Sequence, residues 1–469
     1  MEYRAALLFL FLYYIRPQDW IPAMVGFNIV RPVILIWIAS FMNARSRSPV
    51  PGVFKTPHDW AMLAYYGYIV WTSPDSNGTF KAFLPYVVFY FFTLHSLTTW
   101  ERVLGYLKFW NFMLLGVAFM AVASLYGLDL TGAKDMTSMF FDRLCIGTWL
   151  HNNPNALAHS VIVAIPLSYV LYFWKGGFTG RIIIFPLCSA LAAHCAYSTQ
   201  SKGSFLVGGV LCVLVFVIGR PKAVQIFAIA IAATLGVSAL SFLPRMEKMG
   251  NLRADEGVQG RLMVWEMARE ITRTKSTGEG WGQFKGYIIW EGQMENKATH
   301  SSYVQVGAEL GINGLFCYLL LLWIAGRSLL VGSQLTQPET DHERCRRAAM
   351  LLLIAYCMSG WMINRQYHNE YFLVIAVAAA IHRLNLAEFK RAQDLLLQAG
   401  AETSSSTNPE ADGEKTAPQR PEEQIPEPLM AFLNSGKRLW NRITAVDIGV
   451  GVAATWAVLT TWDYVLKNL

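Results

Sequence analysis

Charged residues are scarce in this sequence. Only 15% of its 469 residues are Asp, Glu, Lys or Arg, whereas an ordinary soluble chain has about 25%. Hydrophobic residues make up 54%. A soluble core stops growing at about 250–300 residues, so a large water-facing globule is an unlikely host for so much apolar surface. The composition also excludes a disordered chain, a collagen and a secreted disulfide scaffold.

Cysteine provides neither a disulfide framework nor a metal site. The 7 cysteines are scattered, and no Cys-x-x-Cys pair occurs. Five of them lie within apolar runs, where a thiol behaves as a small hydrophobic side chain: Cys188, Cys195, Cys212, Cys317 and Cys357. The cysteines therefore indicate no metal cluster.

Long uncharged runs indicate a membrane protein. Residues 203–219 and 223–244 contain no charged side chain, and runs of about 18 such residues match the thickness of the hydrocarbon layer. Comparable runs lie near residues 3–15, 22–42, 58–74, 82–99, 105–126, 154–174, 182–200, 304–326, 348–364 and 370–382. Since helices satisfy their own backbone groups in lipid, the pattern predicts an all-α, polytopic bundle of about twelve transmembrane helices. No small-residue cleavage site follows the first run, which we expect to be retained.

The short loops predict the orientation of the bundle, because Lys and Arg prefer the cytoplasmic side. With a cytoplasmic N-terminus, the inner loops contain Arg45, Arg47, Lys55, Arg102, Lys108, Lys175, Arg181, Arg220, Lys222, Arg327, Arg344, Arg346 and Arg347. The short outer loops contain only Arg16, Lys81, Lys134, Arg143, Lys202 and Arg365. We therefore expect residues after 382 in the cytoplasm and the largest loop, 245–303, on the external face.

The chain after the expected membrane domain, 1–382, divides into two parts. Residues 383–444 are expected to form a cytoplasmic tail, within which 400–428 is rich in Ser, Thr, Pro and Glu and is typical of a disordered linker. Residues 445–466 are apolar enough for a thirteenth span. Asp447 and several small residues weaken that interpretation, so an interfacial helix is the alternative.

The external loop contains a predicted amphipathic helix with a basic residue at its start. Over Gly257–Lys275, apolar residues including Trp265 recur at spacings of three and four, which suits a helix resting on the membrane or capping the bundle. Arg261 opens this helix just after a glycine, and its guanidinium could hold two phosphate oxygens at once. The alternative is a surface arginine paired with Glu266 or Glu270.

Two further segments on the same face carry chemistry-bearing side chains. Lys202 lies at the outer membrane boundary, flanked by Ser201 and Ser204; the alternative to anion binding is a lysine that extends to the interface. His300 precedes the next span together with Tyr303, and an imidazole of near-neutral pKa can accept a proton from a hydroxyl nucleophile. A structural histidine is the alternative there.

Two polar clusters open other spans. Asn153 and Asn155 flank a proline, so helix capping is the preferred role and contact with a polar substrate the second. Arg365 and His368 lie in the loop before the last span of the bundle. Arg365 is either a further anion contact or a partner of Glu370.

The order of these motifs resembles the O-antigen ligase and polymerase superfamily over roughly residues 140–330. The motifs are NPNA at the start of a span, SKGS between two spans, GRLMVW in the large loop, the GWG turn at 280–282, and HSSYVQVGAELGINGL from residue 300. The resemblance implies that the loop arginine is Arg261, the histidine at the end of the loop is His300, and the basic residue between two spans is Lys202. The family usually has arginine at that last position, and lysine provides a point charge instead of a bidentate fork.

The resemblance implies a membrane glycosyltransferase of the bacterial cytoplasmic (inner) membrane. It would transfer a glycan from an undecaprenyl-diphosphate carrier to an acceptor hydroxyl on the periplasmic face, without a metal, another cofactor or a nucleotide sugar. Its partners would be the donor, the acceptor and membrane lipids, with no nucleic acid. Lys202 and Arg261 would neutralise the diphosphate and His300 would act as the base. Asn153, Asn155, Ser201, Ser204, Trp265, Tyr303, Arg365 and His368 are candidate substrate contacts. No acidic pair resembles a glycosidase dyad, so direct displacement with inversion is expected.

Several alternatives remain at this level. The acceptor is lipid A core, a protein or a growing glycan, as in lipopolysaccharide or exopolysaccharide synthesis, so a ligase and a polymerase are both compatible with the sequence. A lipid-linked glycan transporter would also be a twelve-span bundle, but it should carry charges in a central cavity. A scaffold protein of the cell envelope would not need Lys, Arg and His on one face.

Overall fold

The described part of the chain folds into a helical bundle with a small β-hairpin. The computed structural model describes residues 1–26, 29–44, 52–217, 223–227, 230, 256–290, 293–337, 340–405, 425–437 and 439–468. The elements are α1 Glu2–Tyr14, α2 Pro17–Trp20, α3 Val30–Ala44, α4 Pro57–Thr72, α5 Ser76–Ser96, α6 Trp100–Leu125, α7 Ala133–Met139, α8 Pro154–Val161, α9 Ala164–Ser168, the π-helical turns η2 Tyr169–Phe173 and η3 Gly180–Ile184, α10 Phe185–Ser198, α11 Lys202–Val217, α13 Glu256–Thr274, β1 Tyr287–Trp290, β2 Gln293–Asn296, α14 Ser302–Gly332, α15 Asp341–Ser359, α16 Asn369–Ser405, α17 Glu427–Asn434 and α18 Ala445–Asn468. Strands β1 and β2 pair antiparallel, with Ile289 opposite Met294.

Six helices among the described residues are long and apolar enough to cross a membrane. They are Trp100–Leu125, Pro154–Phe173, Gly180–Ser198, Ser302–Gly332, Asn369–Ala399 and Ala445–Asn468. Val30–Asn43 and Lys202–Val215 are apolar but shorter. The prediction of a helical, multi-pass membrane protein is thus confirmed, whereas the count of twelve spans stays a prediction. The expected span 223–244 lies almost entirely outside the described residues.

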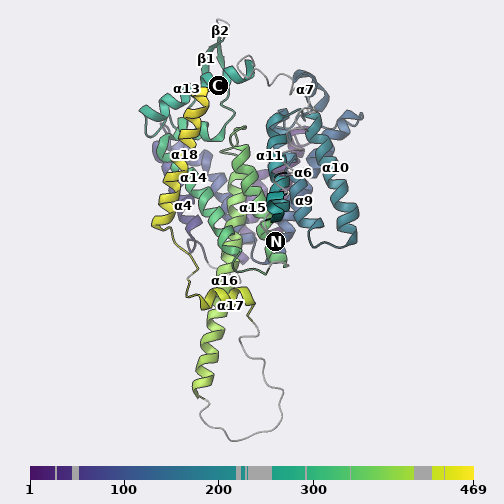
Figure 1. Ribbon diagram of the computed structural model, residues 1–469. Helices are drawn as coiled ribbons and strands as arrows, with labels where there is room; N and C mark the ends of the chain where they lie inside the picture. The colour runs from purple at the N-terminus through teal and green to yellow at the C-terminus, as the bar shows by residue number, and fades with distance from the viewer. Residues whose placement is uncertain are drawn as a thin grey trace.

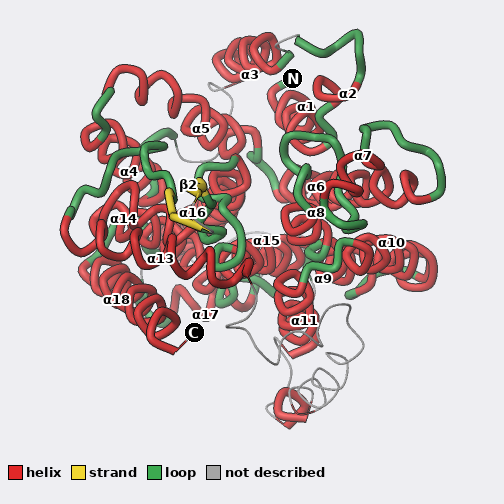
Figure 2. Tube along the Cα trace, turned by 90° about the horizontal axis from the view of Figure 1, so that it is seen from above, coloured by secondary structure: helices red, strands yellow, loops and turns green. Residues whose placement is uncertain are grey.

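Helix α16 forms the centre of the bundle. Figure 2 shows it surrounded by neighbouring helices, and it contacts α5, α14, α15 and α6. Every residue from Glu370 to Leu386 is buried. The run 374–381 consists of Ala, Val and Ile, and small side chains allow helices to approach closely in the absence of a hydrophobic driving force from lipid.

The two ends of the bundle differ in what they carry. Figure 1 shows α7, α13, the β-hairpin and the C-terminus at one end, and α17 with the long extension of α16 at the other. By the charge bias of the loops, the first end is the expected external face and the second the cytoplasmic one. Helix α17 packs on the extension through a cluster of apolar side chains, Leu335, Leu386, Phe389, Ala392, Ile425, Leu429, Phe432 and Leu439.

Helices α16 and α17 reach the two ends of the predicted linker. Residues 400–405 continue α16, which ends at Ser405, and α17 begins at Glu427. The stretch after residue 382 is rich in Leu, Ala, Glu and Gln, which are strong helix formers. The rest of the expected linker, 406–424, lies outside the described residues.

A kink in α14 anchors the turn at 276–282 to the bundle. Gly311 has φ 64°, which breaks the helical geometry. The turn at 276–282 docks there: the Glu279 amide donates to the Ala308 carbonyl at 3.0 Å, and the Gly280 amide donates to the Glu309 carbonyl at 2.7 Å. A β-carbon at residue 311 would clash with the Ser276 carbonyl, so glycine is required for this close approach.

Candidate functional site

The segment that carries His300 is held between α13 and the loop after α15. The Trp265 indole donates to the Thr299 carbonyl at 2.7 Å, and the Ser302 amide donates to the Gly360 carbonyl at 2.6 Å. His300 itself has φ 49°, in the left-handed region that a non-glycine residue adopts only when its surroundings impose it. The fold therefore specifies the position of this imidazole from both sides.

His300 lies beside Arg261. Burial lowers the pKa of the imidazole to about 4, and the positive charge of Arg261 contributes to the same shift. The side chain is consequently neutral near pH 7 and has a lone pair available to accept a proton. The two residues that the sequence predicted as base and anion contact are thus brought together by α13 and the end of the loop.

A third basic side chain joins this pair. Lys297 lies over Gly260, where an added β-carbon would come within 2.9 Å of its Cδ atom. Its ammonium pairs with Glu295 at 3.1 Å. The glycine before Arg261 therefore admits the lysine to the start of α13.

Lys202 is the first residue of α11, at the same end of the bundle. The next residue, Gly203, packs against Met362 and against His159, whose Nε2 would lie 3.2 Å from an added β-carbon. The predicted serines serve this turn, because Ser204 Oγ donates to the Ser201 carbonyl at 2.8 Å and both are buried.

The loop after α15 connects the Lys202 side with the His300 side. Met362 contacts Gly203, as above, while Asn364 Oδ1 accepts a hydrogen bond from Thr299 Oγ1 at 2.8 Å. Ser302 Oγ donates to the Ile363 carbonyl at 2.8 Å. The loop after α15 therefore contacts both the start of α11, where Lys202 lies, and the segment that carries His300.

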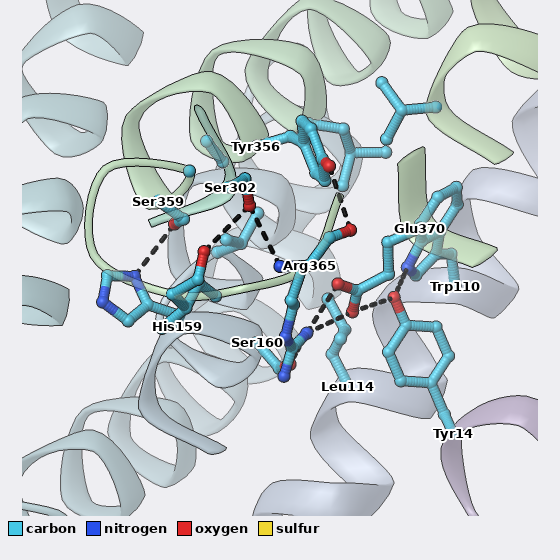
Figure 3. Close-up of a pocket in the computed structure, with 16 residues that line it drawn as sticks. Tyr14, Trp110, Leu114, His159, Ser160, Ser302, Tyr356, Ser359, Arg365 and Glu370 are labelled. Atoms are coloured by element: carbon cyan, nitrogen blue, oxygen red, sulfur yellow. Dashed lines mark hydrogen bonds and ion pairs between the residues drawn. The ribbon is translucent and has the colours of Figure 1, made fainter. Parts of the chain in front are cut away.

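Arg365 is in a different environment (Figure 3). Its guanidinium donates to both carboxylate oxygens of Glu370 at 2.6 Å and to Ser160 Oγ at 2.7 Å. Tyr14 donates to the same carboxylate at 3.0 Å. These groups, with His159, border a small cavity of about 50 Å³. Of the two roles expected for Arg365, pairing with Glu370 is the one that the structure shows.

The two asparagines at the start of α8 have local partners. Asn153 is the N-cap, and its side-chain oxygen accepts from the Asn155 amide at 2.9 Å, as the preferred interpretation of the sequence expects. Asn155 accepts from the Arg143 guanidinium at 2.8 Å. Arg143 also donates to the Thr199 carbonyl at 3.1 Å, which ties this loop to the end of α10.

The remaining predicted contacts lie within packed surroundings. Trp265 is buried against Trp361 with its indole hydrogen-bonded as described above. The Tyr303 hydroxyl donates to the Cys357 carbonyl at 2.6 Å. His368 stacks on Trp149 at 5.1 Å between ring centroids, and burial, followed by the charge of Arg365, lowers its pKa to about 4.

His159 was not among the candidate residues predicted from the sequence. Its Nδ1 lies 2.9 Å from Ser359 Oγ, and its other ring nitrogen faces the glycine that follows Lys202. The available signal was its position in the helix that the Asn-Pro-Asn motif opens. Within the described part of the chain, no group of three or more His, Cys, Asp or Glu side chains is placed to hold a metal ion.

Comparison with known proteins agrees with the geometry. Residues 187–319 match the family model described as O-Antigen ligase, a segment that runs from α10 to the middle of α14 and includes Lys202, Arg261 and His300. No curated protein matches the chain. The matched segment lies within the 140–330 region in which the motifs resemble this superfamily, so the resemblance is confirmed. Residues 187–319 are thus similar to the O-antigen ligase family, whose members are membrane glycan-processing proteins.

Proposed function

We propose that this protein is an O-antigen ligase-like glycosyltransferase of the bacterial inner membrane. It transfers a glycan from an undecaprenyl-diphosphate carrier to an acceptor hydroxyl at the periplasmic face. Similarity of residues 187–319 to the O-antigen ligase family supports a lipid-linked glycan and an acceptor in general. The proposal includes the identity of the donor, the roles of the site residues and the side of the membrane on which they act.

The observation that carries the proposal is the pairing of a buried neutral imidazole with a guanidinium. Because burial and Arg261 hold the His300 pKa at about 4, the imidazole is unprotonated when the acceptor arrives. Binding of an anionic diphosphate at Arg261 offsets that positive charge, so the His300 pKa rises towards its ordinary value. The donor thereby strengthens the base that is needed for its own reaction.

The bond changes of the proposed step balance without a further reactant. The acceptor oxygen forms a bond to the anomeric carbon as the bond from that carbon to the phosphate oxygen breaks. The hydroxyl proton passes to His300, and undecaprenyl diphosphate leaves with the bonding electrons. Attack opposite the leaving group inverts the anomeric centre.

Positive charge at the diphosphate stabilises the transition state, since negative charge develops on the leaving phosphate. Arg261 has the planar fork that suits two phosphate oxygens, whereas Lys202 supplies a compact charge at the membrane boundary. An apolar helix bundle below them suits the polyprenyl tail. These contributions explain why both cations belong at the end of the bundle and not in its interior.

Replacement of His300 by alanine tests the proposal. Loss of a general base reduces the rate about 100- to 10,000-fold, so we expect glycan transfer in membranes to fall by this amount while the amount of folded protein is unchanged. His194→Ala is the matched control, because that imidazole is exposed. Full transfer by the His300→Ala protein would refute the base assignment.

Glycolipid analysis of a deletion strain separates the related activities. Accumulation of long carrier-linked chains indicates a ligase, and accumulation of single repeats indicates a polymerase. If the protein is a transporter, its deletion should leave the carrier-linked glycan on the cytoplasmic side of the membrane, whatever the length of the glycan. We expect long chains on the periplasmic side.

A further inference from the structure

The C-terminal helix α18 lies outside the segment that matches the family. It packs along α14 and reaches the end of the bundle where α13 lies (Figures 1 and 2). The sequence alone left open whether this segment spans a membrane, and the structure shows a helix of sufficient length and hydropathy. Its last turns contact α13, which begins at Glu256, so that Arg261 lies in its second turn and does not open the helix as the sequence predicted.

Trp462 is the first of these contacts. It has no exposed surface, and its indole donates to the Trp265 carbonyl of α13 at 3.2 Å. On its other side the ring lies against Gly307 of α14, where an added β-carbon would come within 3.1 Å. The indole is therefore a wedge between α13 and α14, and the glycine leaves room for it.

Asp463 is the second contact. It accepts two hydrogen bonds from the Arg269 guanidinium, at 2.8 and 2.9 Å, and a third from Arg273 at 3.0 Å. The two arginines lie one helical turn apart on α13, so a single carboxylate holds two successive turns. The Arg269 side chain is only 11% exposed, which protects this bidentate pair from solvent screening.

The other end of α18 is anchored separately. Asp447 has no exposed surface and accepts from Arg327 at 2.5 Å and from the Trp323 indole at 3.0 Å. Between the two anchors, α18 exposes Val452 (56%) and Trp456 (68%). A helix that is held at both ends and exposes apolar side chains between them is suited to face lipid along its length.

We propose that α18 is the positioning helix of the donor site. Trp462 and Asp463 hold α13 against α14 so that Arg261 stays beside His300. This inference rests on the proposed function for its catalytic consequence, but the contacts that define it are independent of the reaction.

The geometry of α13 converts a small displacement into a large effect. Arg261, Trp265 and Arg269 follow one another at spacings of four, so they share one stripe of the helix. At about 1.5 Å per residue, Arg261 lies about 12 Å along the axis from Arg269. A tilt of about 5° at Arg269 would then move Arg261 by about 1 Å, and a displacement of that size can reduce the rate about 100-fold.

The experiment compares full-length Trp462→Ala and Asp463→Asn with Trp456→Ala, which truncates an exposed tryptophan of the same helix. We expect kcat/KM for the lipid-linked donor to fall about 10- to 100-fold in the first two variants, with an unchanged acceptor KM. The acid limb of the pH profile should move to higher pH, because Arg261 moves away from His300 and the imidazole pKa rises. Asp463→Glu should restore most of the activity.

A second readout does not depend on activity. Hydrogen exchange of residues 256–274 should become faster in Trp462→Ala and Asp463→Asn and remain unchanged in Trp456→Ala. Unchanged exchange in the first two variants overturns the positioning role. Normal kcat/KM with faster exchange overturns the link to the donor site. If exchange becomes faster but the wild-type protein transfers no glycan, α18 still positions α13 and only the proposed function fails.

Discussion

Two arginines at the same end of the bundle are used differently. Arg365 is 4% exposed and donates to both oxygens of Glu370, with Ser160 as a further acceptor. Arg261 lies instead beside His300, where its positive charge contributes to lowering the pKa of the imidazole. The buried Arg365 is held in place by its carboxylate partner, whereas the charge of Arg261 acts on a neighbouring imidazole.

The strongest way to break this comparison is to remove one partner of the buried pair. Arg365→Met leaves the Glu370 carboxylate without its positive partner. We therefore expect the free energy of unfolding to fall by about 3–5 kcal/mol. Thermal unfolding of the purified protein in detergent measures this. The double variant Arg365→Met/Glu370→Leu should recover most of the loss, because apolar replacement of both partners is often neutral. Normal stability of Arg365→Met with weaker donor binding would identify Arg365 as an anion contact after all.

Substitution of Arg261 should change donor binding and the pH profile, and leave the stability of the protein unchanged. In Arg261→Lys the bidentate fork is lost, and a hydrogen bond to a charged group contributes about 1.5–3 kcal/mol, so donor KM should rise at least about tenfold. The charge remains, so the acid limb of kcat/KM should stay near the His300 pKa of about 4. In Arg261→Met the charge is lost as well, and the limb should move to higher pH. Steady-state kinetics between pH 3.5 and 8 with purified donor measure both effects, and an unchanged donor KM in the lysine variant would exclude bidentate recognition.

Lys202→Arg should give the smallest effect. The exchange restores the residue type that the family usually has and adds a fork at the membrane boundary. An interfacial charge contact contributes about 0.2–1 kcal/mol, so donor KM should fall by less than about fivefold, with no change in unfolding temperature. Titration of transfer rate with donor measures this change. A large loss of activity would show that the turn at Gly203 requires the slimmer lysine stem.

The helical class and the site motifs could be predicted from the sequence because they depend on local patterns. Uncharged runs require helices in lipid, and the spacing of apolar residues predicted a helix over 257–275, which the structure has as Glu256–Thr274. His300 and Arg261 were singled out by residue type and position. Their proximity was not predictable, because it depends on the docking of the 276–282 turn at the kink of α14.

Charges within the bundle were harder to predict. Arg383, His58 and Asp59 are buried within the bundle. Asp59 accepts from the Tyr90 hydroxyl at 2.9 Å, and Arg383 lies 3.1 Å from the His95 ring. Such partners come from helices that are distant in sequence, so no local pattern reveals them. They lie at the end of the bundle opposite His300, which separates them from the proposed reaction.

The sequence by itself determined that the protein lies in a membrane and that its secondary structure is helical. It also indicated which residues are able to bind a diphosphate or accept a proton. Composition and periodicity are properties of short segments, and they act before any long-range contact forms. Only the tertiary structure decided which arginine is neutralised by a carboxylate, which one lies against the imidazole, and that the last helix of the chain returns to hold α13. Those outcomes depend on distances between segments far apart in the chain, which packing alone sets.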